Sequence, residues 1–222
     1  AFREAYRDAP ILDKGIATIR EFLEMPMIPG LAELKSHPQG TGTYVYPGGD
    51  ARSIWDLNGC FDDPIGKKAA LEVIVKAGKV LIDAAESGSS QGVNSHGGLG
   101  PWNILIQANG EVLIDEYGIP QVDFLDFIED DEYLPKDDRL RYSPPERIEG
   151  AAEDISSDLF TLALIVVEMI AGEPLYDAEG EALLKIAEKG EADKALEEFE
   201  FSEDVEELLF PALAPFPDQR YK

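Results

Sequence analysis

The chain has 222 residues, a length that suits one large domain or two small ones. Hydrophobic residues make up 44% and charged residues 29%, a globular composition that excludes a disordered or collagen-like chain. The 19 Lys and Arg residues face 45 Asp and Glu residues, for a formal net charge of −26. This charge argues against nucleic acid and acidic membrane surfaces as partners, because both are anionic.

No segment is predicted to cross a membrane or to direct secretion. The longest apolar run, Leu159 to Val167, is much shorter than a membrane span. The start at Ala1 shows neither a basic region nor a hydrophobic stretch, so no signal peptide is visible, although the chain has the character of a fragment. The single cysteine, Cys60, forms no internal disulfide. We therefore expect a cytoplasmic protein.

The first third of the chain is predicted to hold two helices and a strand. Apolar residues at helical spacing predict a helix over 11–25, which the following prolines end. A strand is expected over 42–46, before a Pro-Gly-Gly turn. After a short apolar piece over 54–57, a long helix is predicted over 67–85.

The middle of the chain is predicted to contain a hairpin, because two apolar runs, 104–106 and 112–114, flank an Asn-Gly pair. Residues 88–100 are rich in Ser and Gly and indicate a loop, whereas 118–142 is acidic and irregular. The expected class is α+β and mostly helical.

The last third is predicted to be helical. A buried helix is expected over 159–171, with Ser156, Ser157 and Asp158 as candidate N-caps and Gly172 after its end. Amphipathic helices are expected over 180–189, 193–199 and 204–213.

An ordered set of motifs runs through this layout: His96-Gly97-Gly98-Leu99-Gly100-Pro101-Trp102-Asn103, Glu116-Tyr117-Gly118, Ser143-Pro144-Pro145-Glu146, Asp158 and Arg220. In order and spacing this set resembles the large lobe of the protein-kinase fold, in particular the bacterial Ser/Thr kinases of eukaryotic type. The resemblance covers residues 65–222 well and residues 11–60 loosely. It implies a reduced small lobe over 1–50 and a kinase-like large lobe over 51–222.

The chain departs from the family at the residues that carry out catalysis. Gly98 stands where the resemblance implies the catalytic Asp, and Gly100 where it implies the catalytic Lys. Asn103 is retained, and Glu116 replaces the metal-binding Asp, with Asp115 as the alternative if the register shifts by one. We therefore expect no catalytic residue, no resident cofactor and no metal, with Asn103, Glu116 and Gly118 as remnants of the nucleotide site.

The residues that hold the family's large lobe together are retained. The resemblance implies that Asp158 binds the backbone of the catalytic loop, and that Glu146 forms an ion pair with Arg220. His96 is expected to be a packed histidine, since no nucleophile motif accompanies it. We predict a structural role for these four residues.

A protein interface is predicted near 47–57, where a short small lobe would leave apolar surface uncovered. Trp55 is the candidate for this surface, and Asp130 and Asp131 are candidates for steering a basic partner. The acidity has a second interpretation, as a solvated surface or an adaptation to salt.

Two functions follow from this pattern. The first is a catalytically inactive pseudokinase, not an enzyme, that binds or scaffolds proteins in bacterial signalling or assembly. The alternative is a weak or atypical ATP-dependent phosphotransferase that uses Asn103 and Glu116, with a base from elsewhere. The sequence names no partner and no oligomeric state.

Overall fold

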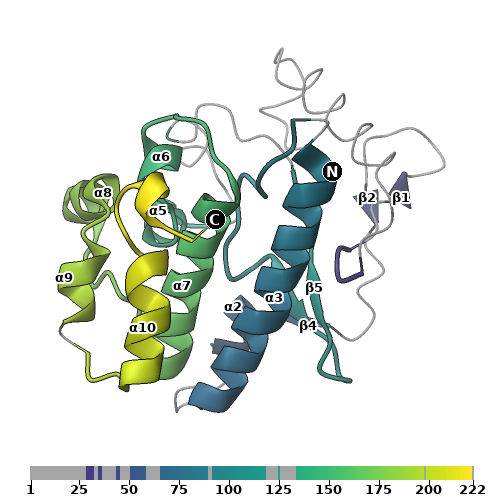
Figure 1. Ribbon diagram of the computed structural model, residues 1–222, viewed down its shortest axis with the longest axis horizontal. Helices are drawn as coiled ribbons and strands as arrows, with labels where there is room; N and C mark the ends of the chain where they lie inside the picture. The colour runs from purple at the N-terminus through teal and green to yellow at the C-terminus, as the bar shows by residue number, and fades with distance from the viewer. Residues whose placement is uncertain are drawn as a thin grey trace.

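The computed structural model shows a mostly helical body with two small sheets at its side (Figure 1). It describes residues 29–32, 35–36, 44–45, 51–58, 66–89, 92–118, 125, 134–197 and 199–221. The helix predicted over 11–25 lies outside these residues, as do Asp130 and Asp131.

Helix α3 (Lys67–Gly88) is the long helix that the apolar spacing predicts, and it continues three residues beyond the predicted end. Its buried face includes Val73, Ala77, Leu81 and Ala84, which recur at helical spacing. This face packs along α7 (Ile155–Ala171), and the pair forms the centre of the core.

Helix α7 is apolar nearly all round, and most of its residues are buried. It begins earlier than predicted, because Asp154 is the N-cap, and none of the three candidates named from the sequence holds that position. The Asp154 carboxylate accepts a hydrogen bond from the Ser156 N–H at 2.8 Å, and the Ser157 hydroxyl completes a capping box. Gly172, with φ of 81°, ends the helix as expected.

The sheet confirms the predicted hairpin. Strands β4 (Ile104–Ile106) and β5 (Val112–Ile114) pair antiparallel, and β3 (Arg52–Ser53) joins the other edge of β4. Leu31 forms a parallel bridge to Ile114. In a separate two-stranded sheet, β1 (Lys35–Ser36) pairs with β2 (Tyr44–Val45). Strand β2 lies within the strand predicted over 42–46.

Short helices complete the body. The apolar piece after β3 is α2 (Ile54–Asn58). The expectation of irregular structure up to residue 142 is wrong at its end, where helix α5 (Lys136–Arg141) forms. Helix α6 (Pro145–Ile148) follows it. The three predicted C-terminal helices are present: α8 (Gly180–Lys189), α9 (Ala192–Leu196) and α10 (Glu203–Ala212).

In Figure 1, α3 and α10 run on either side of α7, and the sheet lies on the far side of α3 from α10. None of the helices in the described residues is both long and apolar enough to cross a membrane.

Candidate functional site

The candidate site is the loop 96–103, which connects the end of α3 to β4 and lies against the turn that follows β5. The backbone carbonyl of His96 accepts a hydrogen bond from the Gly118 N–H at 3.1 Å, which ties the loop to that turn. Gly97 and Gly118 have φ of 78° and 73°, a region that glycine occupies without strain. The two segments thus meet at their glycines.

Behind the loop, His96 and Asp158 are both buried. The His96 N–H donates to Oδ2 of Asp158 at 2.8 Å, so the first turn of α7 holds the start of the loop. Nε2 of His96 lies 2.7 Å from the carbonyl oxygen of Asp115, and burial lowers the pKa of His96 to about 3. Burial raises the pKa of Asp158 well above its ordinary value. Both side chains therefore lie in an environment that disfavours charge.

A second buried contact connects α6 to the end of the chain. Arg220 donates to both carboxylate oxygens of Glu146, at 2.6 and 3.1 Å, in a bidentate pair. The Ser157 hydroxyl lies 2.5 Å from the same carboxylate, and the Arg220 guanidinium stacks 4.4 Å from the ring centroid of Phe160. The pair thus joins α6, α7 and the C-terminal segment.

A third buried contact was not predicted from the sequence. Arg147 forms an ion pair with Glu153 at 2.8 Å, and its Nη1 lies 3.4 Å from the carbonyl oxygen of Leu99, within the loop. The charge of Glu153 raises the pKa of Arg147 against the effect of burial. The one available signal was an arginine directly after Glu146, in a segment that the motif pattern already marked.

On the open side of the loop, one amide and two carboxylates converge. Nδ2 of Asn103 donates to Asp115 at 3.0 Å and to Glu116 at 3.2 Å, and Oδ1 of Asn103 accepts from the Gly100 N–H at 3.2 Å. Burial, and then the charge of Glu116, raise the pKa of Asp115 to about 7. Glu116 has φ of 56°, which only glycine adopts freely. The two alternative carboxylates from the sequence are thus both present at one site.

Gly98 and Gly100 stand where the resemblance implies catalytic side chains, and they differ in what surrounds them. A Cβ atom built on Gly100 would lie 2.2 Å from the indole of Trp102, so the ring occupies the space above this residue. Gly98 is buried and offers no side chain. The loop therefore presents an indole where the resemblance implies a lysine.

Trp102 is the centre of an aromatic cluster. Its ring meets Trp55 edge-on at 6.0 Å and Tyr142 at 5.8 Å, and the Arg139 guanidinium lies 5.1 Å from its centroid. Within the stretch 47–57, where an apolar surface was expected, the structure describes residues 51–57, of which Ile54 is buried and Trp55 is half-buried. The cluster was missed because the tryptophans were considered separately.

No protein-family model matches the chain. The serine/threonine-protein kinase PknB of Mycobacterium leprae is 24% identical over 165 residues, which cover 72% of this chain and 25% of that protein. The probable serine/threonine-protein kinase CPE1738 of Clostridium perfringens is 25% identical over 167 residues, 72% of this chain and 24% of that protein. The chain spans about a quarter of the length of these relatives.

The fold has a solved counterpart. The kinase domain of PknI from Mycobacterium tuberculosis superposes with a TM-score of 0.62 and 16% identity, over 97% of this chain and 75% of that domain.

The relatives correct one prediction. We expected from Gly98 and Gly100 that the chain is not an enzyme, but its relatives are named as Ser/Thr protein kinases, which are enzymes, and this finding overturns that expectation. The physical reason for the error is that two missing side chains were given more weight than the site as a whole, in which an amide and two carboxylates remain together. The chain has the protein-kinase-like fold, a helical large lobe with a reduced small lobe, and its relatives are bacterial Ser/Thr kinases.

Proposed function

We propose that the chain is an atypical ATP-dependent phosphotransferase whose nucleotide site is built on Asn103, Asp115 and Glu116. The observation that carries this proposal is the Asn103 amide, which holds both carboxylates side by side at 3.0 and 3.2 Å. Two adjacent carboxylates repel each other, and such an arrangement is typical of a site that receives a cation.

The donor atoms fit Mg²⁺, the ion that accompanies ATP in kinases. Both carboxylates offer hard oxygen ligands, which Mg²⁺ prefers. Among the described residues, no group of three or more His, Cys, Asp and Glu side chains is arranged to hold a metal ion. The remaining ligands would therefore be phosphate oxygens and water, as is usual for Mg²⁺ in nucleotide sites. When bound, the ion supplies neutralisation of the phosphate charge.

The reaction is a transfer of the γ-phosphoryl group from ATP to an acceptor hydroxyl, which releases ADP and a proton. Most of the catalysis in such transfers comes from positioning and charge stabilisation. Gly98 provides no side chain to accept the proton, so water or a group on the substrate takes it. We expect a low rate for this reason.

The proposal is tested by the transfer of labelled phosphate from ATP in Mg²⁺ buffer, with and without a Ser/Thr-rich acceptor protein. We expect incorporation of label, and a loss of at least about tenfold in Asn103→Ala and Glu116→Gln. Glu111→Gln is the matched control, since Glu111 lies exposed in the adjacent hairpin. Label that is absent, or that all three variants retain equally, would show that the site transfers no phosphate.

A second candidate function is protein binding in bacterial signalling or assembly, which is compatible with phosphotransfer. It is favoured by the indole of Trp102, which fills the space above Gly100 and replaces a catalytic cation with apolar surface. The division at residue 50, a basic partner for the acidic residues and a cytoplasmic location stay predictions.

A further inference from the structure

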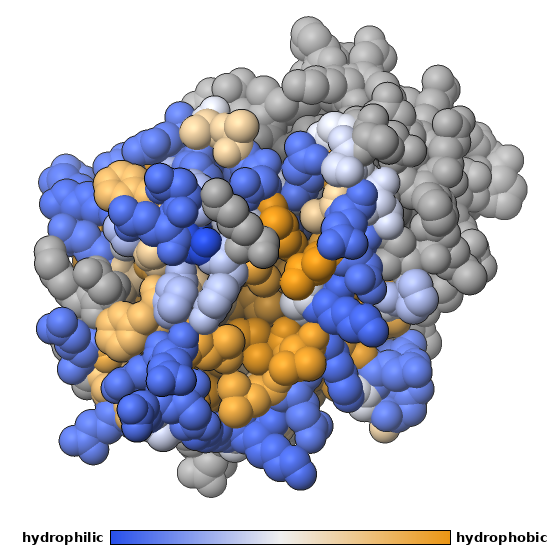
Figure 2. Space-filling model, in the orientation of Figure 1, coloured by the Kyte–Doolittle hydropathy of each residue, from blue (hydrophilic) through white to orange (hydrophobic). Residues whose placement is uncertain are grey.

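One side of α3 carries apolar side chains that the described part of the chain leaves exposed. Leu71, Val75 and Ile82 lie at helical spacing along it, and Val75 is 70% exposed and Ile82 41% exposed. Figure 2 shows an apolar patch with hydrophilic borders in the middle of the face on which Figure 1 places α3, α7 and α10. Contiguous apolar surface of this kind usually marks an interface.

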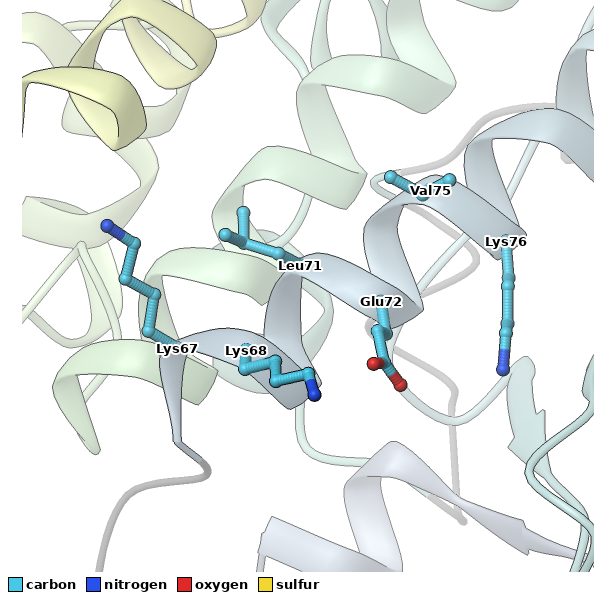
Figure 3. Close-up of a pocket in the computed structure, with 6 residues that line it drawn as sticks. All are labelled: Lys67, Lys68, Leu71, Glu72, Val75 and Lys76. Carbon is cyan, nitrogen blue, oxygen red and sulfur yellow. The ribbon is translucent and has the colours of Figure 1, made fainter.

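A shallow, open pocket lies on this side of α3, and all the residues that line it belong to this helix. Its lining is Lys67, Lys68, Leu71, Glu72, Val75 and Lys76, and its volume is about 640 Å³, which holds several side chains. In Figure 3, Leu71 and Val75 project from one side of the helix, while Lys68, Glu72 and Lys76 project from another. The apolar stripe therefore has a charged border along its length.

This border is basic, in contrast to the molecule as a whole. Residues 67–79 contain four lysines and one glutamate, although the chain carries a net charge of −26. Lys67 pairs with Asp204 of α10 at 2.8 Å, and Lys76 donates to the carbonyl of Gly110 at 2.7 Å. Lys68 and Lys79 are exposed and have no ion-pair partner among the described residues.

We propose that Leu71, Val75 and Ile82, with Lys68 and Lys79, form a docking surface for an amphipathic helix of a partner protein whose apolar stripe is flanked by carboxylates. We call these five residues the α3 surface. Helical spacing of its apolar members suits a helix laid alongside. Charge favours an acidic flank at this surface, because Lys68 and Lys79 are exposed beside its apolar residues. This inference is independent of the proposed phosphotransfer.

The test is fluorescence anisotropy with two labelled helical peptides of about 18 residues, a length that forms a marginally stable helix in water. Both peptides carry leucines at i, i+4 and i+7 spacing. One has glutamates along the flanks of the stripe, and the other has lysines. We expect the acidic peptide to bind, and the basic peptide to bind at least about tenfold more weakly.

Variants separate the two parts of the surface. Val75→Ser should weaken the binding of the acidic peptide by about tenfold. Phe216→Ser is the control at another exposed apolar side chain (60%), and it should leave the binding of this peptide unchanged. Lys68→Glu with Lys79→Glu should weaken binding and reduce its dependence on salt, whereas Lys185→Glu with Lys189→Glu should do neither.

Several outcomes would overturn the inference: no binding of the acidic peptide, equal binding of both peptides, or binding that Val75→Ser does not change. Sedimentation equilibrium tests a second copy of the chain as the occupant. A dimer that Val75→Ser dissociates would show that a second copy of the chain, and not a partner helix, occupies the surface. Competition between a labelled single-stranded oligonucleotide and the acidic peptide would show that the surface binds nucleic acid and not a partner helix.

Discussion

The two sides of the loop 96–103 differ in what they retain. Behind the loop, three buried polar contacts are present: His96 to Asp158, Glu146 to Arg220, and Arg147 to Glu153. Within the loop, two buried glycines stand where the resemblance implies side chains, while Asn103 holds two carboxylates, of which Glu116 is exposed. The loop 96–103 is thus held in place by contacts behind it, and none of these contacts involves Gly98 or Gly100 as a side-chain partner.

The strongest test of this comparison is removal of the buried ion pair. Arg220→Ala leaves Glu146 buried without its counter-ion, and we expect a loss of about 3 to 5 kcal/mol in the free energy of unfolding. Lys189→Ala, at the exposed end of α8, should have little effect. Urea denaturation measures both, and similar small losses would mean that the back of the loop contributes little stability.

A substitution at Gly100, within the loop itself, should cost less stability than the loss of the ion pair. Gly100→Ala places a Cβ against the Trp102 indole, which we expect to destabilise the fold by about 1 to 3 kcal/mol. Gly66→Ala is the control, since nothing lies within 4 Å of its Cβ position. Addition of Trp102→Ala should relieve part of the cost of Gly100→Ala. Strictly additive losses would show that the ring does not occupy that space.

Acid tests the burial of His96. Its pKa falls from 6.5 in the unfolded chain to about 3 in the fold, so only the unfolded chain binds a proton between these values. Stability should therefore fall as the pH decreases below 6.5, by about 2 kcal/mol between pH 7 and pH 5. This slope is measured relative to His96→Gln, which does not titrate there. Parallel pH profiles would indicate that the pKa of His96 is the same in the fold as in the unfolded chain.

The smallest expected effect concerns the start of α7. Asp154→Ala removes the N-cap and should cost about 1 kcal/mol, whereas exposed Glu179→Ala, which precedes α8 without a side-chain cap, should cost less. Thermal denaturation compares the two. Equal losses of stability in the two variants would show that the Asp154 side chain does not cap α7.

Much of the fold could be predicted from local patterns. The α3 helix, the hairpin and the buried α7 helix each have a clear apolar period or turn signal. The N-cap of α7 was misplaced because Asp154, Ser156, Ser157 and Asp158 are all capping residues, and only the backbone distinguishes them.

The site was harder to predict than the fold. The motif spacing identified Asn103 and two alternative carboxylates, but periodicity cannot show that one amide holds both. The Trp102 ring above Gly100 and the Arg147 contact to Leu99 depend on packing between distant segments. A glycine in a motif is seen in sequence only as a missing side chain, whereas the structure shows what occupies its space.

The most direct test of the central claim is the melting temperature of the chain with millimolar ATP in the presence and absence of Mg²⁺. A ligand at 100 times its Kd stabilises the fold by about 2.7 kcal/mol, so binding gives a clear rise in Tm. We predict a rise that requires Mg²⁺, that is lost in Glu116→Gln and that persists in Glu111→Gln. An unchanged Tm, or a rise that Glu116→Gln retains in full, would contradict a nucleotide site at Asn103, Asp115 and Glu116.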